Sequence, residues 1–249
     1  MSEIADYDPR RGWDALYASS RVVPDEPEPD VQAIVSELRE LAGDGPALEL
    51  GVGHGRIAIP LADTGLEVDG IDYSAKGIEL IRAHSKGGAV SASVADISDF
   101  ALGRRYALVY LVFNTIQNLT TQDQQVACFE NAAAHLQHGG RFVIENVVPD
   151  LRRLTPGTNM VPVSVSDDYI VIDEYTDLLH RQQLRSRHLQ RRKDGSFAEL
   201  AVPFRFVWPA ELDLMARIAG MTLEHRWSDW DRSPFTDDSS SAISVWRLA

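Results

Sequence analysis

The sequence has almost no cysteine. Cys128 is the only one among 249 residues, so no disulfide can form within the chain. It lies between Ala127 and Phe129, with no setting around it that would lower its pKa, and this favours a small buried core residue over a catalytic thiol. No pair of histidines or cysteines has the spacing of zinc ligands, and neither a GxSxG elbow nor a P-loop lysine is present. The sequence therefore predicts no metal site and no hydrolase.

Long apolar runs and an excess of basic residues are also missing. No stretch reaches about 18 uninterrupted apolar residues, and the N-terminus has no apolar run of signal-peptide length, so we expect a cytoplasmic protein. Lys and Arg number 24 against 37 Asp and Glu, a net charge of −13. Such a charge gives phosphate backbones and anionic lipids little attraction, so we expect no nucleic-acid partner and no membrane partner. A small-molecule substrate fits better.

Strand-like and helix-like segments alternate through the first 150 residues. Short apolar strands are predicted at 46–53, 67–72, 89–96, 105–114 and 141–148, with helices between them at 56–65, 74–87 and 121–136 and a further helix before them at 31–41. An HGG turn at residues 138–140 is expected to precede the last of these strands. This order predicts an α/β fold with a Rossmann-like, doubly wound and mostly parallel sheet.

The pattern changes after Pro149. Apolar and polar residues alternate with period two from Val161 to Phe206, and Asp194-Gly195 marks a hairpin turn, so an antiparallel β insert is predicted. A helix at 208–220 and two strands at 221–230 and 241–249 follow. We expect these last strands to close the sheet.

The strongest motif is a glycine loop at the end of the first strand, Glu49-Leu50-Gly51-Val52-Gly53-His54-Gly55-Arg56. Glycines allow positive φ and let backbone N–H groups approach a ligand, and the following helix N-terminus favours a carboxylate or phosphate. The spacing is GxGxG and not the GxGxxG dinucleotide fingerprint, so a tight strand-to-helix turn without a ligand is the alternative.

Acids stand at the tips of the next two strands. Asp72 ends the second strand, where an acid accepts hydrogen bonds from ribose hydroxyls in Rossmann-like sites. Asp96 ends the third, where a carboxylate can accept from an adenine amine with Ile97 beside the ring. Either acid alone could be a helix N-cap. Together with the loop they line the crevice where open α/β sheets bind ligands.

Six segments, ELGVGHGR, GIDYS, VADISDF, YLVFNTIQNL, HGGRFVIE and WPAELDLMARIAGM, resemble the class I S-adenosylmethionine-dependent methyltransferases over nearly the whole chain. The resemblance implies S-adenosylmethionine as cofactor and S-adenosylhomocysteine as product. It implies that the loop under the methionyl group is formed by Glu49, Gly51, Gly53 and Gly55, with Arg56 beside them, and that Asp72 is the acid that binds the ribose. It also implies that the adenine is contacted by Tyr73, Asp96 and Ile97, and that the wall near the sulfonium is formed by Phe113 and Asn114.

Many relatives carry a Tyr-Asp pair in the N-terminal segment, with the tyrosine closing over the cofactor carboxylate. The corresponding stretch here is Gly12-Trp13-Asp14-Ala15-Leu16-Tyr17, so Trp13 replaces the phenol. An indole N–H could still donate a hydrogen bond to the cofactor. Alternatively, Trp13 only anchors the N-terminal helix.

The insert resembles the antiparallel lid of sugar-amine and glycine N-methyltransferase-like members. That resemblance implies that the insert covers the substrate and offers strands through which a homodimer could form. We therefore expect a single domain at 1–249, divided into an N-terminal helical cap at 1–42, a cofactor-binding core at 43–149, a lid insert at 155–206, and the final helix and terminal strands at 207–249. The sheet is expected to have seven strands.

Candidates for an acid or base are Glu145, at the end of the fifth strand, and His180 or His188 in the insert. Glu145 could instead cap the next loop, and the histidines could be exposed strand residues. His54 could approach the cofactor or point to solvent. The resemblance implies methyl transfer to a nitrogen or oxygen of a small metabolite, with secondary metabolism as the expected setting. The alternatives are a non-methylating member of the fold, such as a cyclase or decarboxylase, a NAD-dependent oxidoreductase, and a noncatalytic binding protein.

Overall fold

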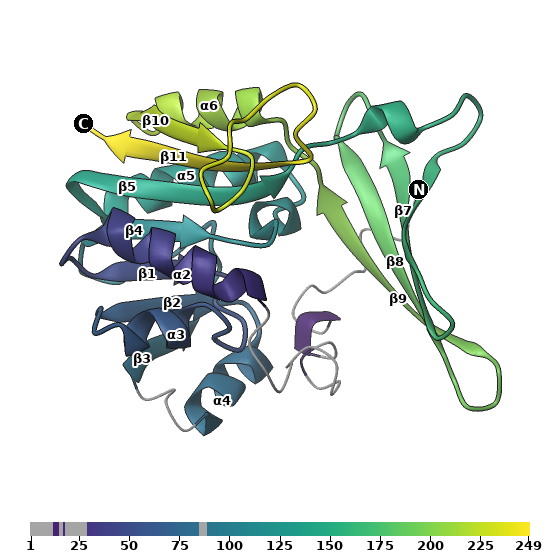
Figure 1. Cartoon of the computed structure of the whole chain (residues 1–249), viewed down its shortest axis with the longest axis horizontal. Helices are drawn as coiled ribbons and strands as arrows, with labels where there is room; N and C mark the ends of the chain where they lie inside the picture. Colours follow the sequence, from purple (N-terminus) through teal and green to yellow (C-terminus); the bar gives the residue numbers. More distant parts are fainter. Residues whose placement is uncertain (1–11, 15–16, 18–28, 85–88) are drawn as a thin grey trace.

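A seven-stranded sheet forms the centre of the computed structural model, which describes residues 12–14, 17, 29–84 and 89–249 (Figure 1). The strands lie in the order β10-β11-β5-β4-β1-β2-β3. Strands β1 to β5 are parallel to their neighbours among them, whereas β11 is antiparallel to both β5 and β10. The bounds are β1 (Ala47–Leu50), β2 (Val68–Asp72), β3 (Val90–Val94), β4 (Tyr106–Leu111), β5 (Leu136–Val147), β10 (Met221–Trp227) and β11 (Ser241–Leu248). The Rossmann-like, mostly parallel seven-stranded sheet expected from the sequence is confirmed.

Helices cover both faces of this sheet. One core cluster joins it to α2 (Pro29–Ala42), α3 (Ala58–Asp63) and α4 (Ala75–Ala83), and a second joins it to α5 (Gln122–His135) and α6 (Pro209–Ile218). Strand β4 shows why its sequence is a continuous apolar run: Val109 and Tyr110 are both fully buried, one in each cluster. None of the described helices is long and apolar enough to cross a membrane.

Two of the helices begin as their sequences predict. The Ser74 hydroxyl accepts a hydrogen bond from the Gly77 N–H at the start of α4. Thr121 and Gln124 form a capping box at the start of α5, with the Thr121 hydroxyl accepting from the Gln124 N–H. These caps satisfy N–H groups that have no partner inside the helix.

The predicted strands differ from the observed ones at two ends. The run 105–114 was expected to be strand throughout, but β4 ends at Leu111, and Phe113 and Asn114 turn away with φ of 53° and 61°. The expected turn at His138-Gly139-Gly140 lies instead inside β5, which begins at Leu136. Gly139, with φ of 75°, and a register shift in the β4–β5 pairing accommodate the turn-like sequence within the strand.

A second, antiparallel sheet has the order β6-β7-β8-β9 and stands beside the main sheet (Figure 1). Its strands are β6 (Met160–Val165), β7 (Tyr169–Asp177), β8 (Gln183–Arg191) and β9 (Phe197–Arg205). Gly195, with φ of 84°, lies in the predicted turn between β8 and β9. The insert expected from the period-two pattern is therefore an antiparallel sheet.

The sheet order reverses beside β1. From β1 the chain builds outward through β2 to β3, and it then returns to place β4 on the other side of β1. Loops at the carboxyl ends of β1 and β4 diverge at such a point and leave a crevice between them. The short 3₁₀ helix η2 (Thr115–Asn118) follows β4 at this edge.

Candidate active site

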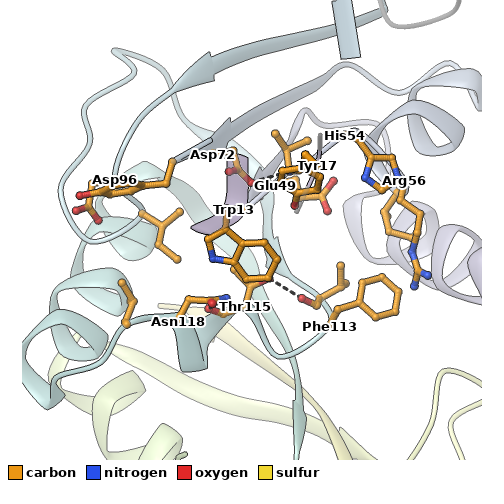
Figure 2. A pocket seen from close by; sticks show the side chains of 18 of the residues that line it. Trp13, Tyr17, Glu49, His54, Arg56, Asp72, Asp96, Phe113, Thr115 and Asn118 are labelled. Carbon is orange, nitrogen blue, oxygen red and sulfur yellow. Dashed lines mark hydrogen bonds between the residues drawn. The ribbon is translucent and has the colours of Figure 1, made fainter. Parts of the chain in front are cut away.

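A cavity of about 320 Å³ lies at this crevice (Figure 2). The described residues around it come from the N-terminal segment, the tips of β1, β2 and β3, and the stretch from β4 to α5. They are Trp13, Tyr17, Glu49, Gly51, Val52, Gly53, His54, Arg56, Ile57, Asp72, Tyr73, Asp96, Ile97, Val112, Phe113, Thr115, Asn118, Leu119 and Gln124. Successive strand tips thus contribute to one concave site.

Backbone forms one wall of the cavity because the loop after β1 has no room for side chains. Gly51 and Gly53 have φ of 79° and 54°. A Cβ at Gly51 would stand 2.5 Å from Thr115 Cγ2, and one at Gly53 would stand 2.5 Å from Tyr17 Oη. Glycine is therefore required at both positions for the loop to hold this shape against its neighbours.

Asp72 holds the glycine loop and the next helix in place. Its Oδ2 accepts from the Gly53 N–H and its Oδ1 from the Ser74 N–H, both at 2.7 Å. Burial raises the pKa of this carboxyl, opposed by these backbone hydrogen bonds, and nearby Asp14 raises it further. Asp14 in turn accepts from the Ser74 hydroxyl and the Lys76 N–H, which ties the N-terminal segment to α4.

Glu49 is a buried acid at the cavity, only 3% exposed. One carboxylate oxygen accepts a hydrogen bond from the Tyr110 hydroxyl at 3.0 Å. Burial raises the pKa of Glu49 to about 8, Asp72 adds to the rise, and the Tyr110 hydrogen bond and Arg56 oppose it. The carboxyl is consequently mostly protonated at neutral pH in the ligand-free protein.

Aromatic rings close the cavity on the side of the N-terminal segment. The rings of Trp13 and Tyr17 are 5.9 Å apart, and those of Tyr17 and His54 are also 5.9 Å apart (Figure 2). Burial raises the pKa of the Tyr17 phenol, and the charges of Asp72 and Glu49 raise it further, so Tyr17 stays a hydrogen-bond donor. Burial lowers the pKa of His54, with Arg56 contributing, which keeps this imidazole neutral.

The corner after β4 is held in an uncommon conformation. Phe113 and Asn114 both have positive φ, which is unusual for residues with a side chain. The Glu145 carboxylate accepts from the Phe113 N–H at 2.8 Å, and Asn114 Oδ1 accepts from the Val147 N–H at 2.5 Å. The Arg56 guanidinium lies 3.5 Å from the centre of the Phe113 ring, a cation–π contact across the cavity's rim.

Asp96 lies at the far end of the cavity, at the tip of β3 (Figure 2). Its Oδ1 accepts from both the N–H and the hydroxyl of Ser98, at 2.8 and 2.7 Å. This turn fixes the carboxylate and leaves Oδ2 for a ligand. Ile97 and Leu119 provide apolar surface beside it, as a flat base would require.

Comparisons with known proteins agree on one family. The family described as "Methyltransferase domain" matches residues 47–140. The solved structure of the CcbJ methyltransferase from Streptomyces caelestis is 34% identical, with a TM-score of 0.86 over 98% of this chain and 100% of that one. The chain belongs to the S-adenosylmethionine-dependent methyltransferases.

Two further similarities cover less of the chain or show the fold alone. A curated methyltransferase of Streptomyces fradiae, dTDP-3-amino-3,6-dideoxy-alpha-D-glucopyranose N,N-dimethyltransferase, is 32% identical over 98 residues, which are 39% of this chain and 38% of that relative. The S-adenosylmethionine-bound CalS10, an amino pentose methyltransferase from Micromonospora echinaspora, is 18% identical over 96% of this chain and 94% of its own, with a TM-score of 0.65. The latter shares the methyltransferase fold.

The cavity of the methyltransferase suits its cofactor in shape and in chemistry. S-adenosylmethionine has a cationic end, a ribose and an adenine. The cavity offers a bare backbone wall with two buried acids at one end and the Asp96 turn with apolar surface at the other. An acid such as Glu49 complements a cationic group, an acid such as Asp72 can accept from hydroxyls, and the apolar residues complement the base.

Most of the residues expected to bind the cofactor line this cavity. They are Trp13, Glu49, Gly51, Gly53, Arg56, Asp72, Tyr73, Asp96, Ile97 and Phe113. Gly55 and Asn114 are not among the described lining residues. A Cβ at Gly55 would stand 2.7 Å from Ile59 Cδ1. Asn114 Oδ1 accepts a hydrogen bond from the Val147 N–H. Both therefore shape the loops that face the cavity.

Neither expected acid–base residue is among the described lining residues. The Glu145 carboxylate accepts from the backbone N–H of Phe113 and so supports the corner after β4, and not the loop after β5 that it was expected to cap as an alternative. His180 is exposed between β7 and β8, where its backbone N–H donates to Asp177. His188, also considered, accepts or donates a hydrogen bond with the Tyr169 hydroxyl within the antiparallel sheet.

The sequence reasoning missed four polar lining residues: Tyr17, Thr115, Asn118 and Gln124. Tyr17 could have been found, because it lies four residues after Trp13 and therefore on the same face of a helix. A phenol is therefore present at the cavity beside Trp13. Thr115 and Asn118 carried no signal, because the sequence did not indicate the 3₁₀ helix that directs them.

Proposed function

We propose that the enzyme methylates an amine nitrogen of a small metabolite of secondary metabolism, with the cofactor held in the cavity at the tips of β1, β2 and β3. The observation that carries this is the convergence of the bare Gly51–Gly53 wall with Glu49, Asp72 and Asp96. The full-length similarity to CcbJ and the partial similarity to an aminosugar N,N-dimethyltransferase support the choice of substrate class.

Each strand tip receives one part of the cofactor. The loop at Gly51 and Gly53 takes the methionyl group, near Glu49 and the Tyr17 phenol. Asp72 accepts from the ribose hydroxyls, since each of its oxygens keeps a lone pair after bonding the backbone. Asp96 Oδ2 accepts from the adenine amine.

Bound S-adenosylmethionine supplies an activated methyl group, and the chain supplies position. An amine that arrives neutral needs no strong base, and alignment against the methyl carbon can supply much of the acceleration. His54 is the only histidine among the described lining residues, and its pKa is lowered. Phe113, at the rim, would form the wall beside the reacting atoms.

The antiparallel sheet β6–β9 would cover the acceptor. It is attached where the acceptor must enter, because β9 packs against η2 beside the cavity. Gln183 at the start of β8 also donates to the Thr120 carbonyl, directly after the lining residue Leu119. The homodimer expected from the sequence stays a prediction, which light scattering of the purified protein tests.

A labelled-methyl assay tests the proposed function. The probe is dTDP-3-amino-3,6-dideoxyglucose, and its matched control is the sugar nucleotide with a hydroxyl in place of the amine. We expect the amine to gain the label, with a mass increase of one methyl group in place of hydrogen, and the hydroxyl compound to gain none. If a panel of primary and secondary amines stays unlabelled while hydroxyl acceptors are methylated, the assignment to nitrogen is wrong.

A further inference from the structure

Oδ1 of Asn118, at the end of η2, has no hydrogen-bond partner within the described residues and is shielded from solvent. The amide of Asn118 lines the cavity on the side of Thr115 and Phe113, across from Asp72 (Figure 2). A buried carbonyl oxygen without a donor is costly, so a ligand is the natural source of one.

The orientation of this amide is determined by its other end. Asn118 Nδ2 donates to the Thr115 carbonyl at 3.1 Å. Exchanging the nitrogen and oxygen would place two oxygens against each other, so the flipped amide is disfavoured. The unpartnered atom is therefore an acceptor, and the ligand must bring an N–H or O–H group to it.

The donors of the cofactor already have acids to receive them. In the proposed arrangement the ammonium faces Glu49, the ribose hydroxyls face Asp72, and the adenine amine faces Asp96. Asn118 is not one of these acids: it ends η2, the short helix that follows the Phe113 corner, where the reacting atoms are placed. The donor left without an acceptor is the N–H of the molecule that receives the methyl group.

We propose that Asn118 Oδ1 accepts a hydrogen bond from the acceptor amine during methyl transfer, and that Asn118 thereby selects nitrogen over oxygen. This inference rests on the proposed function. As the nitrogen–carbon bond forms and the carbon–sulfur bond breaks, the nitrogen lone pair becomes the new bond and the sulfur keeps the electron pair of the old one. The nitrogen becomes cationic and retains its proton, which leaves to water after release.

A neutral carbonyl suits this step. Its hydrogen bond to the N–H strengthens as positive charge develops on nitrogen, so it stabilises the transition state more than the ground state. A tertiary amine, an ionised phenol or an alkoxide has no hydrogen to offer and would leave Oδ1 without a partner. Selection for an acceptor that carries an N–H follows from that difference.

Sinefungin tests the proposal without knowledge of the natural acceptor. In sinefungin a carbon that bears an amine replaces the sulfur that bears the methyl group. Its N–H groups therefore lie where the methyl group and the incoming nitrogen meet. S-adenosylhomocysteine has the same adenine, ribose and amino acid but no group there. Calorimetry measures the affinity ratio of the two ligands for the wild-type enzyme, for Asn118→Leu and for Asn118→Asp.

We expect Asn118→Leu to lower the ratio of the sinefungin affinity to the S-adenosylhomocysteine affinity by about 10-fold, with S-adenosylhomocysteine bound within about twofold of wild type. Asn118→Asp loses the same bond to Thr115 but keeps an acceptor oxygen, so its ratio should equal or exceed that of wild type. Equal weakening of both ligands by Asn118→Leu would place Asn118 at the cofactor's other groups and overturn the proposal. An unchanged ratio would overturn it too. A wild-type enzyme that binds neither ligand would instead overturn the cofactor site on which the proposal rests.

Discussion

A substitution at Gly53 tests whether the cofactor loop must lack a side chain there. A side chain there meets the Tyr17 hydroxyl, with 2.5 Å from Cβ to Oη, and φ is 54°. We expect Gly53→Ala to weaken binding of S-adenosylhomocysteine at least ~10-fold, as measured by calorimetry. The larger Gly53→Val should abolish binding while the circular dichroism stays native.

Gly65 provides the matched control for this substitution. It also has positive φ, 87°, but a Cβ there has no heavy atom within 4 Å. Both alanine variants should lose about 1 kcal/mol of unfolding free energy through the left-handed backbone. Only Gly53→Ala should lose cofactor affinity, and equal affinity in the two variants would remove Gly53 from the site.

The raised pKa of Glu49 predicts how the free energy of unfolding varies with pH. The pKa of this acid is raised from 4.5 to about 8, so the folded protein keeps a proton that the unfolded chain has lost. The unfolding free energy should therefore fall as pH rises from about 4.5 and level off above about 8, by on the order of 5 kcal/mol. Urea unfolding across this range should show a shallower fall for Glu49→Gln. The residual slope belongs to Asp72, whose pKa is raised as well. Parallel curves would show that Glu49 is ionised in the free protein.

The same carboxyl predicts that cofactor binding releases a proton. The cationic groups of S-adenosylmethionine favour the ionised form of Glu49, so affinity should rise as pH increases toward about 8. Titration calorimetry in two buffers with different ionisation enthalpies counts the protons released. We expect release from wild type near neutral pH and a smaller release from Glu49→Gln. Heats that do not depend on the buffer would contradict the protonation of Glu49.

At the residue scale, the place of a side chain in the site was predictable where an acid stands at the tip of a strand. Glu49, Asp72 and Asp96 all line the cavity as their positions suggested. Backbone geometry was not predictable in the same way. The positive φ of Phe113 turns η2 toward the cavity, and no residue pattern announces it.

At the scale of elements, a buried arginine joins the antiparallel sheet to the core. Arg205, at the end of β9 and 3% exposed, donates to Gln125 on α5, Gln182 before β8 and Glu211 on α6. Three elements thus meet at one guanidinium. Its removal would leave buried oxygens without a donor, which is more costly than the loss of an exposed ion pair.

We therefore expect Arg205→Ala to lower the unfolding free energy by about 3–5 kcal/mol, as measured by urea denaturation. Arg187 is the comparison, because in the same sheet it pairs with Glu199 at 2.7 Å and Glu174 at 3.4 Å while its side chain is 32% exposed. Arg187→Ala should cost less than about 1 kcal/mol. Similar losses in both variants would show that the Arg205 network does not anchor the sheet.

Elements were predictable where local chemistry marks their ends. The caps at Ser74 and Thr121 place the starts of α4 and α5 correctly. Strand ends were harder, because an apolar run such as Leu111-Val112-Phe113 is compatible with both a strand and the buried turn that follows it. At Gly139 the error is the reverse: a turn was predicted, but the residue lies in β5, where an irregularity in the strand pairing accommodates it.

At the scale of the whole molecule, the architecture follows from the alternation of strands and helices, whereas the strand order does not. Alternation predicts a parallel sheet covered on both faces. The position of β4 beside β1, which opens the crevice, was not predicted and is given by the sheet order. The site therefore depends on a long-range arrangement that no single segment encodes.

We propose that this crevice holds the methyl donor in an extended pose across three strand tips. The decisive measurement is a crystal structure of the enzyme grown with saturating S-adenosylhomocysteine. We expect the adenine between Ile97 and Leu119 with its amine at Asp96, and the amino-acid end against Gly51 and Gly53. A nucleoside bound elsewhere on the chain, or a crevice that stays empty at saturation, would contradict it.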